Sequence, residues 1–225
     1  MADSRNIVTD YLINRKKAVG VFFIVFYLVG LVGTLVPQTF PMFLKLIPFA
    51  LLLSFVALFI FHEGGITQKI VASFLTIYLL SFIIEAIGVD TGLIFGHYAY
   101  GSSLGVKLFQ TPLIIGINWF FLVYTTATVV DRFLIPSGLK VLVASTLMLV
   151  YDIVLEQLAP VLDMWHWKNS VVPLQNYVAW FALALVFQTF LKIMNVKIQN
   201  KLALLILICQ FLYFLVLLAV NKILV

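Results

Sequence analysis

The sequence predicts an all-α integral membrane protein, a polytopic bundle of seven transmembrane helices. Of its 225 residues, 64% are hydrophobic and 10% are charged, whereas a soluble domain has about 45–50% apolar and about 25% charged residues. Apolar runs of spanning length are separated by breaks rich in proline and glycine. The basic residues also lie mainly at one end of these runs, as they do in membrane proteins.

This composition excludes a soluble enzyme, a disordered tail and a disulfide-stapled secreted domain, because a chain of this size cannot hide so much apolar surface from water. Cys209 is the only cysteine, so no intrachain disulfide forms. The net charge of +5 does not indicate a nucleic-acid-binding protein, because the basic residues are scattered singly between apolar runs. No internal repeat is found, and we expect a single transmembrane domain over residues 1–225.

Each predicted helix is an apolar run of about 20 residues. Uninterrupted hydrophobicity favours helices over membrane strands, in which polar and apolar residues alternate. The first run follows a polar segment, residues 1–17, and lacks a small-residue cleavage site, so we expect it to be retained rather than removed as a signal peptide. The predicted spans are residues 18–36, 42–61, 69–87, 111–130, 139–158, 173–194 and 202–220.

The basic residues predict the orientation of the bundle. The end that carries the N-terminus holds ten of the 14 basic residues, so the positive-inside rule places the N-terminus in the cytoplasm and the C-terminus outside. We therefore expect a multi-pass protein of the cell membrane, the inner membrane in a bacterium. The ten are Arg5, Arg15, Lys16, Lys17, Lys69, Arg132, Lys140, Lys192, Lys197 and Lys201, and the others are Lys45, Lys107, Lys168 and Lys222.

Acidic residues gather at the external end. Asp152 and Glu156 are four residues apart and share one helix face, and Glu85 lies in the last turn of the third predicted span. An isolated charge deep in a span costs about 2.5–3.5 kcal/mol, so we expect these carboxyl groups to pair, to hold a proton or to face a wet cavity. A neutral carboxylic acid in such a site can donate a proton. A position at the membrane interface, where charge is tolerated, is the alternative for Glu85 and Glu156.

Residues 88–101 are too polar and rich in glycine to continue a helix, and they predict a folded loop. His97 in this loop is a candidate proton shuttle, or a hydrogen-bonded structural histidine. One histidine beside carboxylates does not make a metal site, so no metal is expected. All four tryptophans fall on the external half, where they form an interfacial belt or, near residues 165–180, pack against a polyene and stabilise a cation by about 0.5–2 kcal/mol each.

Several functions of membrane proteins do not fit this chain. A retinal protein needs a lysine in the middle of the last span, and residues 202–220 contain none. Di-iron hydroxylases and desaturases need many more histidines than His62, His97 and His166. A phosphate-binding loop, a dinucleotide fingerprint and a nucleophile elbow are absent. The lack of matched halves argues against a transporter.

One ordered set of motifs lies between Glu85 and Trp180. Its members are Glu85-Ala-Ile-Gly88, Thr91-Gly-Leu-Ile-Phe95-Gly96-His-Tyr98-Ala-Tyr100, Leu104-Gly105, Pro112, Trp119, Asp152, Trp165-His-Trp167 and Pro173-Leu-Gln-Asn176-Tyr-Val-Ala-Trp180. With this set the chain resembles the carotenoid biosynthesis proteins of CruF type, the carotenoid 1′,2′-hydratases that include bisanhydrobacterioruberin hydratases. It departs from them at Glu156-Gln157, where Asp-Pro is typical, and at residues 168–172, where a glycine-tyrosine-glycine stretch is shortened.

The resemblance implies that water adds across the terminal C1′–C2′ double bond of an acyclic carotenoid, without a cofactor. Asp152 is the expected proton donor, and Glu85 and Glu156 are expected to tune it or to position water. The expected partners are the carotenoid, water and membrane lipid. The residues expected to bind the substrate are Phe95, Tyr98, Tyr100, Trp119, Trp165, Trp167, Asn176 and Trp180.

Two other functions stay open at this point. The same aromatic residues and glycines would suit a carotenoid- or lipid-binding membrane protein without catalysis, in which the carboxyl groups only hold helices together. Less in keeping with the sequence is a proton-coupled transporter that uses Asp152 and Glu156 as its relay.

Overall fold

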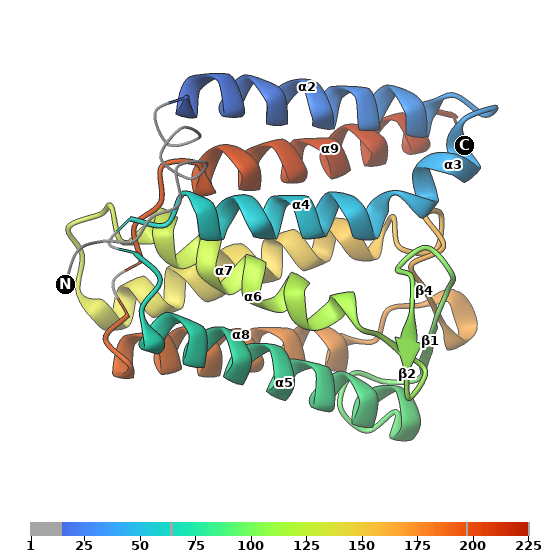
Figure 1. The fold of residues 1–225 in the computed structure, drawn as a ribbon. Helices are drawn as coiled ribbons and strands as arrows, with labels where there is room; N and C mark the ends of the chain where they lie inside the picture. The colour runs from blue at the N-terminus through green and yellow to red at the C-terminus, as the bar shows by residue number, and fades with distance from the viewer. Residues whose placement is uncertain (1–14, 64, 197, 225) are drawn as a thin grey trace.

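The computed structural model describes residues 15–63, 65–196 and 198–224 (Figure 1). All the helices of this part except the short α3 run roughly side by side. In chain order they are α2 (Lys16–Leu35), α3 (Phe40–Lys45), α4 (Ile47–Ile60), α5 (Gln68–Thr91), α6 (Ile114–Val130), α7 (Ser137–Glu156), α8 (Leu174–Ile193) and α9 (Ala203–Leu224).

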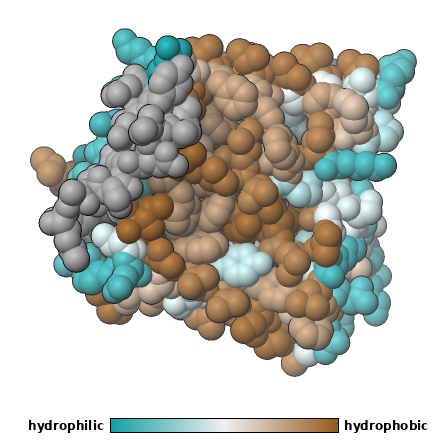
Figure 2. Space-filling model, viewed as in Figure 1, coloured by the Kyte–Doolittle hydropathy of each residue, from teal (hydrophilic) through white to brown (hydrophobic). Residues whose placement is uncertain are grey.

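Five of these helices, α2, α5, α7, α8 and α9, are long and apolar enough to cross a membrane. Two more apolar helices are shorter, with 14 residues in α4 and 17 in α6. Figure 2 shows hydrophobic residues across the broad middle of the molecule and hydrophilic residues gathered toward the two ends of the helices. Large apolar side chains are exposed along α2, α5 and α9, as expected of surfaces that face lipid. The structure is thus the helical, membrane-like bundle that the sequence predicts.

The second predicted span, residues 42–61, is wrong as one continuous helix. It consists of α3 and α4, which are separated at Leu46. Pro48 explains the break, because proline has no N–H for the helix ladder and its ring clashes with the carbonyl oxygen four residues earlier. Pro41, which falls between the first two predicted spans, occupies the first turn of α3, where proline is well tolerated.

The expected loop at residues 88–101 is also partly wrong. Helix α5 continues through Gly88 to Thr91 and ends at Gly92, whose φ of 67° is the left-handed conformation that glycine adopts without a steric penalty. Glu85 therefore lies well inside the helix rather than in its last turn. The fourth predicted span begins too early as well, because Thr111 and Pro112 form a strand.

The described residues contain four short strands that an all-α prediction omits. Strand β1 (Tyr98–Tyr100) pairs antiparallel with β4 (Trp165–Trp167), with Tyr98 opposite Trp167 and Tyr100 opposite Trp165. Strands β2 (Lys107–Leu108) and β3 (Thr111–Pro112) form a second antiparallel pair. A short 3₁₀ turn, η1 (Lys168–Ser170), follows β4. We call the end of the bundle that carries β1 and β4 the strand end (Figure 1).

Helix α6 lies at the centre of the bundle, and 14 of its 17 residues are buried. It packs against α4, α5, α7, α8 and α9, while α7 and α8 pack closely on each other and α2 packs on α9. A helix that is apolar on every side is suited to such a position. Because α5, α7 and α8 all pack against α6, polar side chains that they direct toward it come together near the strand end.

Candidate active site

Glu85 on α5 is the first of three buried carboxyl groups near the strand end. Its Oε2 accepts hydrogen bonds from the hydroxyl groups of Tyr98, at 2.6 Å, and Tyr100, at 2.8 Å. Its Oε1 accepts one from Nε1 of Trp119, at 3.0 Å. Three donors from β1 and α6 thus hold this carboxyl group, so α5, α6 and the strand pair are joined at one point.

Glu156, the last residue of α7, is held in the same way. Its Oε2 accepts from the indole nitrogens of Trp165, at 3.0 Å, and Trp167, at 2.7 Å. Its Oε1 accepts from Nδ2 of Asn176 on α8, at 2.9 Å. Glu85 therefore binds the aromatic residues of β1, and Glu156 binds those of β4. Pairing of the two strands brings all four aromatic residues to the same place.

Asp152 differs from both glutamates. It is fully buried one helical turn before Glu156, on the same face of α7. Its Oδ2 accepts a hydrogen bond of 3.3 Å from Asn176, while Oδ1 is buried and has no hydrogen-bond partner in the described part of the chain. Of the six carboxyl oxygens in this cluster, Oδ1 of Asp152 is thus the one without a donor. A buried oxygen without a partner is costly unless it carries a proton or meets a ligand.

Burial raises the pKa values of the Tyr98 and Tyr100 hydroxyl groups, and the nearby Glu85 carboxylate raises them further. Both hydroxyl groups therefore stay protonated at any physiological pH and donate to Glu85. The tyrosines serve as fixed donors in this arrangement rather than as acids or bases.

A loop contact beyond the helix ends fixes the strand pair. Asp163 accepts hydrogen bonds from the backbone N–H of Ser102, at 2.8 Å, and from its hydroxyl group, at 2.5 Å, and it contacts Nε2 of His166 at 3.0 Å. Hydrogen bonds from His166 and Ser102 lower the pKa of Asp163 to about 2. The N–H of Gly101 also donates to the Met164 carbonyl at 2.8 Å. Together these contacts join the ends of β1 and β4.

A small cavity of about 20 Å³ lies between Glu85 and Glu156. This volume holds roughly one water molecule. Asn176, which donates to Asp152, also lines the cavity, whereas Asp152 itself does not. The other lining residues are Phe95, Tyr98, Tyr100, Ile115, Asn118, Trp165, Trp167 and Trp180.

A larger apolar cavity of about 270 Å³ adjoins the small one, and Ile115, Asn118 and Trp165 line both. Its other walls come from α2, α3, α4, α7 and α9 and are mostly apolar. Some of the polar groups in these walls are paired with one another: Gln210 donates to Tyr151 at 2.7 Å and accepts from Tyr27 at 3.4 Å.

A third hollow opens on the other side of Glu156. It has a volume of about 420 Å³, and both polar and apolar residues line it, among them His166, Ser170 and Tyr177. Glu156 and Trp167 line this hollow and also the small cavity. The carboxyl cluster therefore lies between an apolar cavity and a partly polar outer hollow.

Comparison with known proteins gives the family. The family model for the carotenoid biosynthesis protein matches residues 46–225. The chain belongs to the carotenoid biosynthesis protein family. No curated protein and no solved structure matches it significantly. Helices α2 and α3 lie outside the matched residues, and the match includes all three carboxyl groups.

In this member of the carotenoid biosynthesis family, most of the predicted site residues come together. Phe95, Tyr98, Tyr100, Trp165, Trp167, Asn176 and Trp180 line the small cavity with Glu85 and Glu156, and Trp119 donates to Glu85 and stacks on Trp180 with ring centroids 4.1 Å apart. The structure does not bring His97 to the cluster. Its side chain is exposed and lies against Gly92, where an added Cβ would be 2.3 Å from its Nδ1.

Sequence reasoning missed the residues of the larger cavity. Asn118, Tyr151 and Gln210 are polar residues inside apolar helices, which is the same signal that identified Asp152. Their signal is weaker because amide and hydroxyl groups carry no charge, and Gln210 also lies beyond the motifs, which end at Trp180. Within the described residues, no group of three or more His, Cys, Asp or Glu side chains is placed to hold a metal ion.

Proposed function

We propose that this protein is a carotenoid 1′,2′-hydratase, an enzyme that adds water to the terminal C1′–C2′ double bond of an acyclic carotenoid. The observation that carries the proposal is that Oδ1 of Asp152 accepts no hydrogen bond from the described residues, whereas every other carboxyl oxygen of the cluster accepts at least one. A proton on this oxygen displaces no donor already in place, and it has no acceptor among the described residues.

The reaction begins when the Asp152 carboxyl group gives this proton to the less substituted carbon of the double bond. The π electron pair forms the new C–H bond, and a tertiary carbocation and an aspartate carboxylate remain. A water oxygen then bonds to the cation, and the resulting oxonium loses a proton, which returns to Asp152. The net change is alkene plus water to tertiary alcohol, so no oxidant or reductant is needed.

Glu85 and Glu156 stabilise the cation in this mechanism. Each accepts three hydrogen bonds, and four of these six come from indole or amide N–H groups that can only donate; these donors favour the ionised carboxylate. Fixed negative charge beside a developing cation lowers the barrier without reorganisation during the reaction. The aromatic faces around the small cavity add cation–π stabilisation of about 0.5–2 kcal/mol each.

The cavities support separate routes for the two substrates. The polyene end reaches the cluster through the apolar cavity, and water reaches it through the outer hollow that Glu156 and Trp167 line. The small cavity holds about one water molecule and no end group. We therefore propose that the site widens at Ile115, Asn118 and Trp165, which line both cavities, and at Asn176, which lines the small cavity and donates to Asp152.

The membrane topology belongs to the same proposal. We infer seven passes through the cell membrane, formed by α2, by α3 with α4, and by α5 to α9, with a cytoplasmic N-terminus. The charge distribution and the alternating direction of the helices in Figure 1 support this topology. The strand end then faces the outside.

Pigment analysis tests the activity. The full chain is expressed in cells that accumulate lycopene or γ-carotene, and the extracted carotenoids are compared with those of cells that carry the empty vector. We expect new products heavier by one water, with a tertiary hydroxyl group at the acyclic end. Unchanged pigments in cells that make well-folded protein would exclude hydration of these substrates.

A carotenoid-binding protein without catalysis is the second candidate. The observation that favours it is the full hydrogen bonding of Glu85 and Glu156, which also joins α5, α6, α7, α8 and the strands. Purified protein that carries unmodified carotenoid, from cells in which no hydroxylated product forms, would identify this function.

A further inference from the structure

A basic pocket lies at the end of the bundle opposite the strand end. Four cationic side chains, those of Arg132, Lys140, Lys192 and Lys201, line it together with two carboxylates, those of Glu63 and Asp131. These residues come from the ends of α4, α6 and α8, the first turn of α7 and the turn before α9. The positive charges therefore converge from separate elements, and they exceed the negative charges by two.

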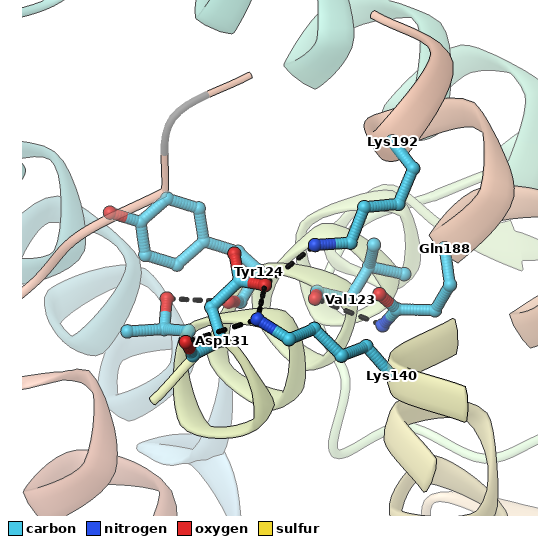
Figure 3. A network of polar contacts seen from close by, with 7 residues as sticks. Val123, Tyr124, Asp131, Lys140, Gln188 and Lys192 are labelled. Carbon is cyan, nitrogen blue, oxygen red and sulfur yellow. Dashed lines mark hydrogen bonds and ion pairs between the residues drawn. The ribbon is translucent and has the colours of Figure 1, made fainter. Parts of the chain in front are cut away.

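The two carboxylates do not satisfy this set of cations. Oδ1 of Asp131 lies 2.6 Å from Nζ of Lys192 and 3.3 Å from Nζ of Lys140, so one oxygen serves both lysines (Figure 3). Lys201 pairs with Glu63 at 3.3 Å. Arg132 makes no ion pair among the described residues, and its guanidinium group has one hydrogen bond, of 3.5 Å, to the Asn200 carbonyl. Two ammonium groups at one oxygen, with a guanidinium group beside them, favour the binding of an additional anion.

The size and the rim of the basic pocket indicate what kind of anion it suits. The pocket has a volume of about 720 Å³, far more than a single small ion fills. Phe133 and Leu134, which directly follow Arg132, have exposed fractions of 56% and 105%, and Ile193, which follows Lys192, is 77% exposed. Apolar side chains beside cations are typical of the membrane interface, where the cation meets phosphate and the apolar group meets acyl chains.

We propose that the basic pocket binds the phosphate headgroup of an anionic phospholipid, with Arg132 and Lys192 as the main contacts. Basic pockets between transmembrane helices on the cytoplasmic side of membranes are known to bind the headgroups of anionic lipids. The site is independent of the carboxyl cluster, so its occupancy does not depend on the proposed hydratase activity. The expected role is to hold the ends of α6, α7 and α8 together, because each contributes a charged group to the pocket.

Thermal unfolding of the purified full chain in detergent tests the proposal. We expect phosphatidylglycerol to raise the Tm by roughly 5 °C, because a ligand that binds only the folded state stabilises it, and phosphatidylcholine to raise it much less. Inorganic phosphate at the same concentration should have little effect, since it lacks acyl chains. An equal shift with inorganic phosphate would overturn a lipid site in favour of a free-anion site, and equal shifts with both lipids would overturn an anion site altogether.

Variants locate the effect. Arg132→Gln removes a cation that has no ion pair among the described residues, so it should fold normally and lose at least half of the shift caused by phosphatidylglycerol. Lys192→Gln should reduce the shift as well, although it also breaks the ion pair with Asp131. Lys168→Gln, an exposed cation at the strand end, should keep the full shift. A full shift in Arg132→Gln would contradict the proposal, and native mass spectrometry of retained phosphatidylglycerol gives a second readout of the same variants.

Discussion

At the residue scale, the three buried carboxyl groups differ in how many donors they face. Glu85 and Glu156 each accept three hydrogen bonds, and Asp152 accepts one. Carboxyl groups of similar chemistry take different roles when their surroundings differ, as they do in other enzymes that use carboxylic acids. In the proposed mechanism this difference separates the proton donor from the two groups that stabilise the cation.

The variant Asp152→Asn tests this division. The amide is nearly isosteric but cannot donate a proton of comparable acidity, so we expect hydration to fall by at least about 10²-fold, the usual contribution of a general acid. Expression, extraction by detergent and Tm should stay close to those of the wild type. Asp90→Asn, which changes an exposed carboxylate on the same molecule, is the matched control and should keep full activity. Normal product formation by Asp152→Asn would move the acid role to Glu85 or Glu156.

At the element scale, the pairing of β1 with β4 brings Tyr98, Tyr100, Trp165 and Trp167 to the two glutamates. Each strand has only three residues, and so short a pair is not stable by itself. The contacts of Asp163 with Ser102 and His166, and the close packing of Gly101 on the Asp163 backbone, hold the strands in register. The site thus depends on a loop contact that none of its own residues makes.

Gly101→Ala should disrupt this contact. An added Cβ would lie 2.2 Å from the Asp163 carbonyl oxygen, a backbone atom that cannot move without shifting the chain. Such a clash costs roughly 1–3 kcal/mol, so we expect the Tm to fall by roughly 3–10 °C, and hydration to fall with it. Gly138→Ala on α7, where no atom lies within 4 Å of the added Cβ, is the control and should leave the Tm unchanged or slightly higher. Equal effects of the two variants would argue against a tightly packed loop.

Asp163 should also make stability depend on pH. Its pKa is about 2 in the folded protein, below the usual value of 3.8, because His166 and Ser102 donate hydrogen bonds to its charged form. A lowered pKa in the folded state stabilises the fold above the unfolded pKa, and this stabilisation is lost as the pH falls through the folded pKa. The Tm difference between the wild type and Asp163→Asn should therefore be constant above about pH 5 and shrink between about pH 4 and pH 2. A difference that does not change across this range would contradict the assignment.

At the scale of the whole molecule, the bundle has two unlike ends. The strand end holds the carboxyl cluster and its aromatic donors, and the opposite end holds the basic pocket. Five long apolar helices and two shorter ones connect them. Of the two shorter helices, α6 is surrounded by other helices. The break between α3 and α4 lies beside the apolar cavity, which residues of both these helices line.

Reporter fusions test the proposed topology. Alkaline phosphatase fused after residue 225 should be active, because it folds only outside the cytoplasm, and a fluorescent protein fused there should stay dark. A phosphatase fusion in the loop after Arg132, between α6 and α7, should be inactive. Activity of this fusion together with inactivity of the C-terminal fusion would reverse the orientation derived from the positive-inside rule.

Much of the fold was accessible from the sequence, because length and hydropathy set where helices form. Helices occur in all seven predicted ranges, although the second range is broken before Pro48 and the third helix continues to Thr91. The strands were not predicted, because two or three residues carry too little periodic pattern to be recognised. The pairing of β1 with β4 joins residues that are more than 60 positions apart, and no local sequence pattern indicates such a contact.

The sequence by itself determined the membrane class, the family resemblance and the identity of the three carboxyl groups. It did so because charge in an apolar span is costly, and each such residue is therefore conspicuous. Only the tertiary structure decided that Glu85 and Glu156 face three donors each, that Oδ1 of Asp152 faces none, and that His97 lies away from the cluster. Hydrogen bonds depend on distances between atoms of separate helices and strands, and these are fixed only when the bundle packs.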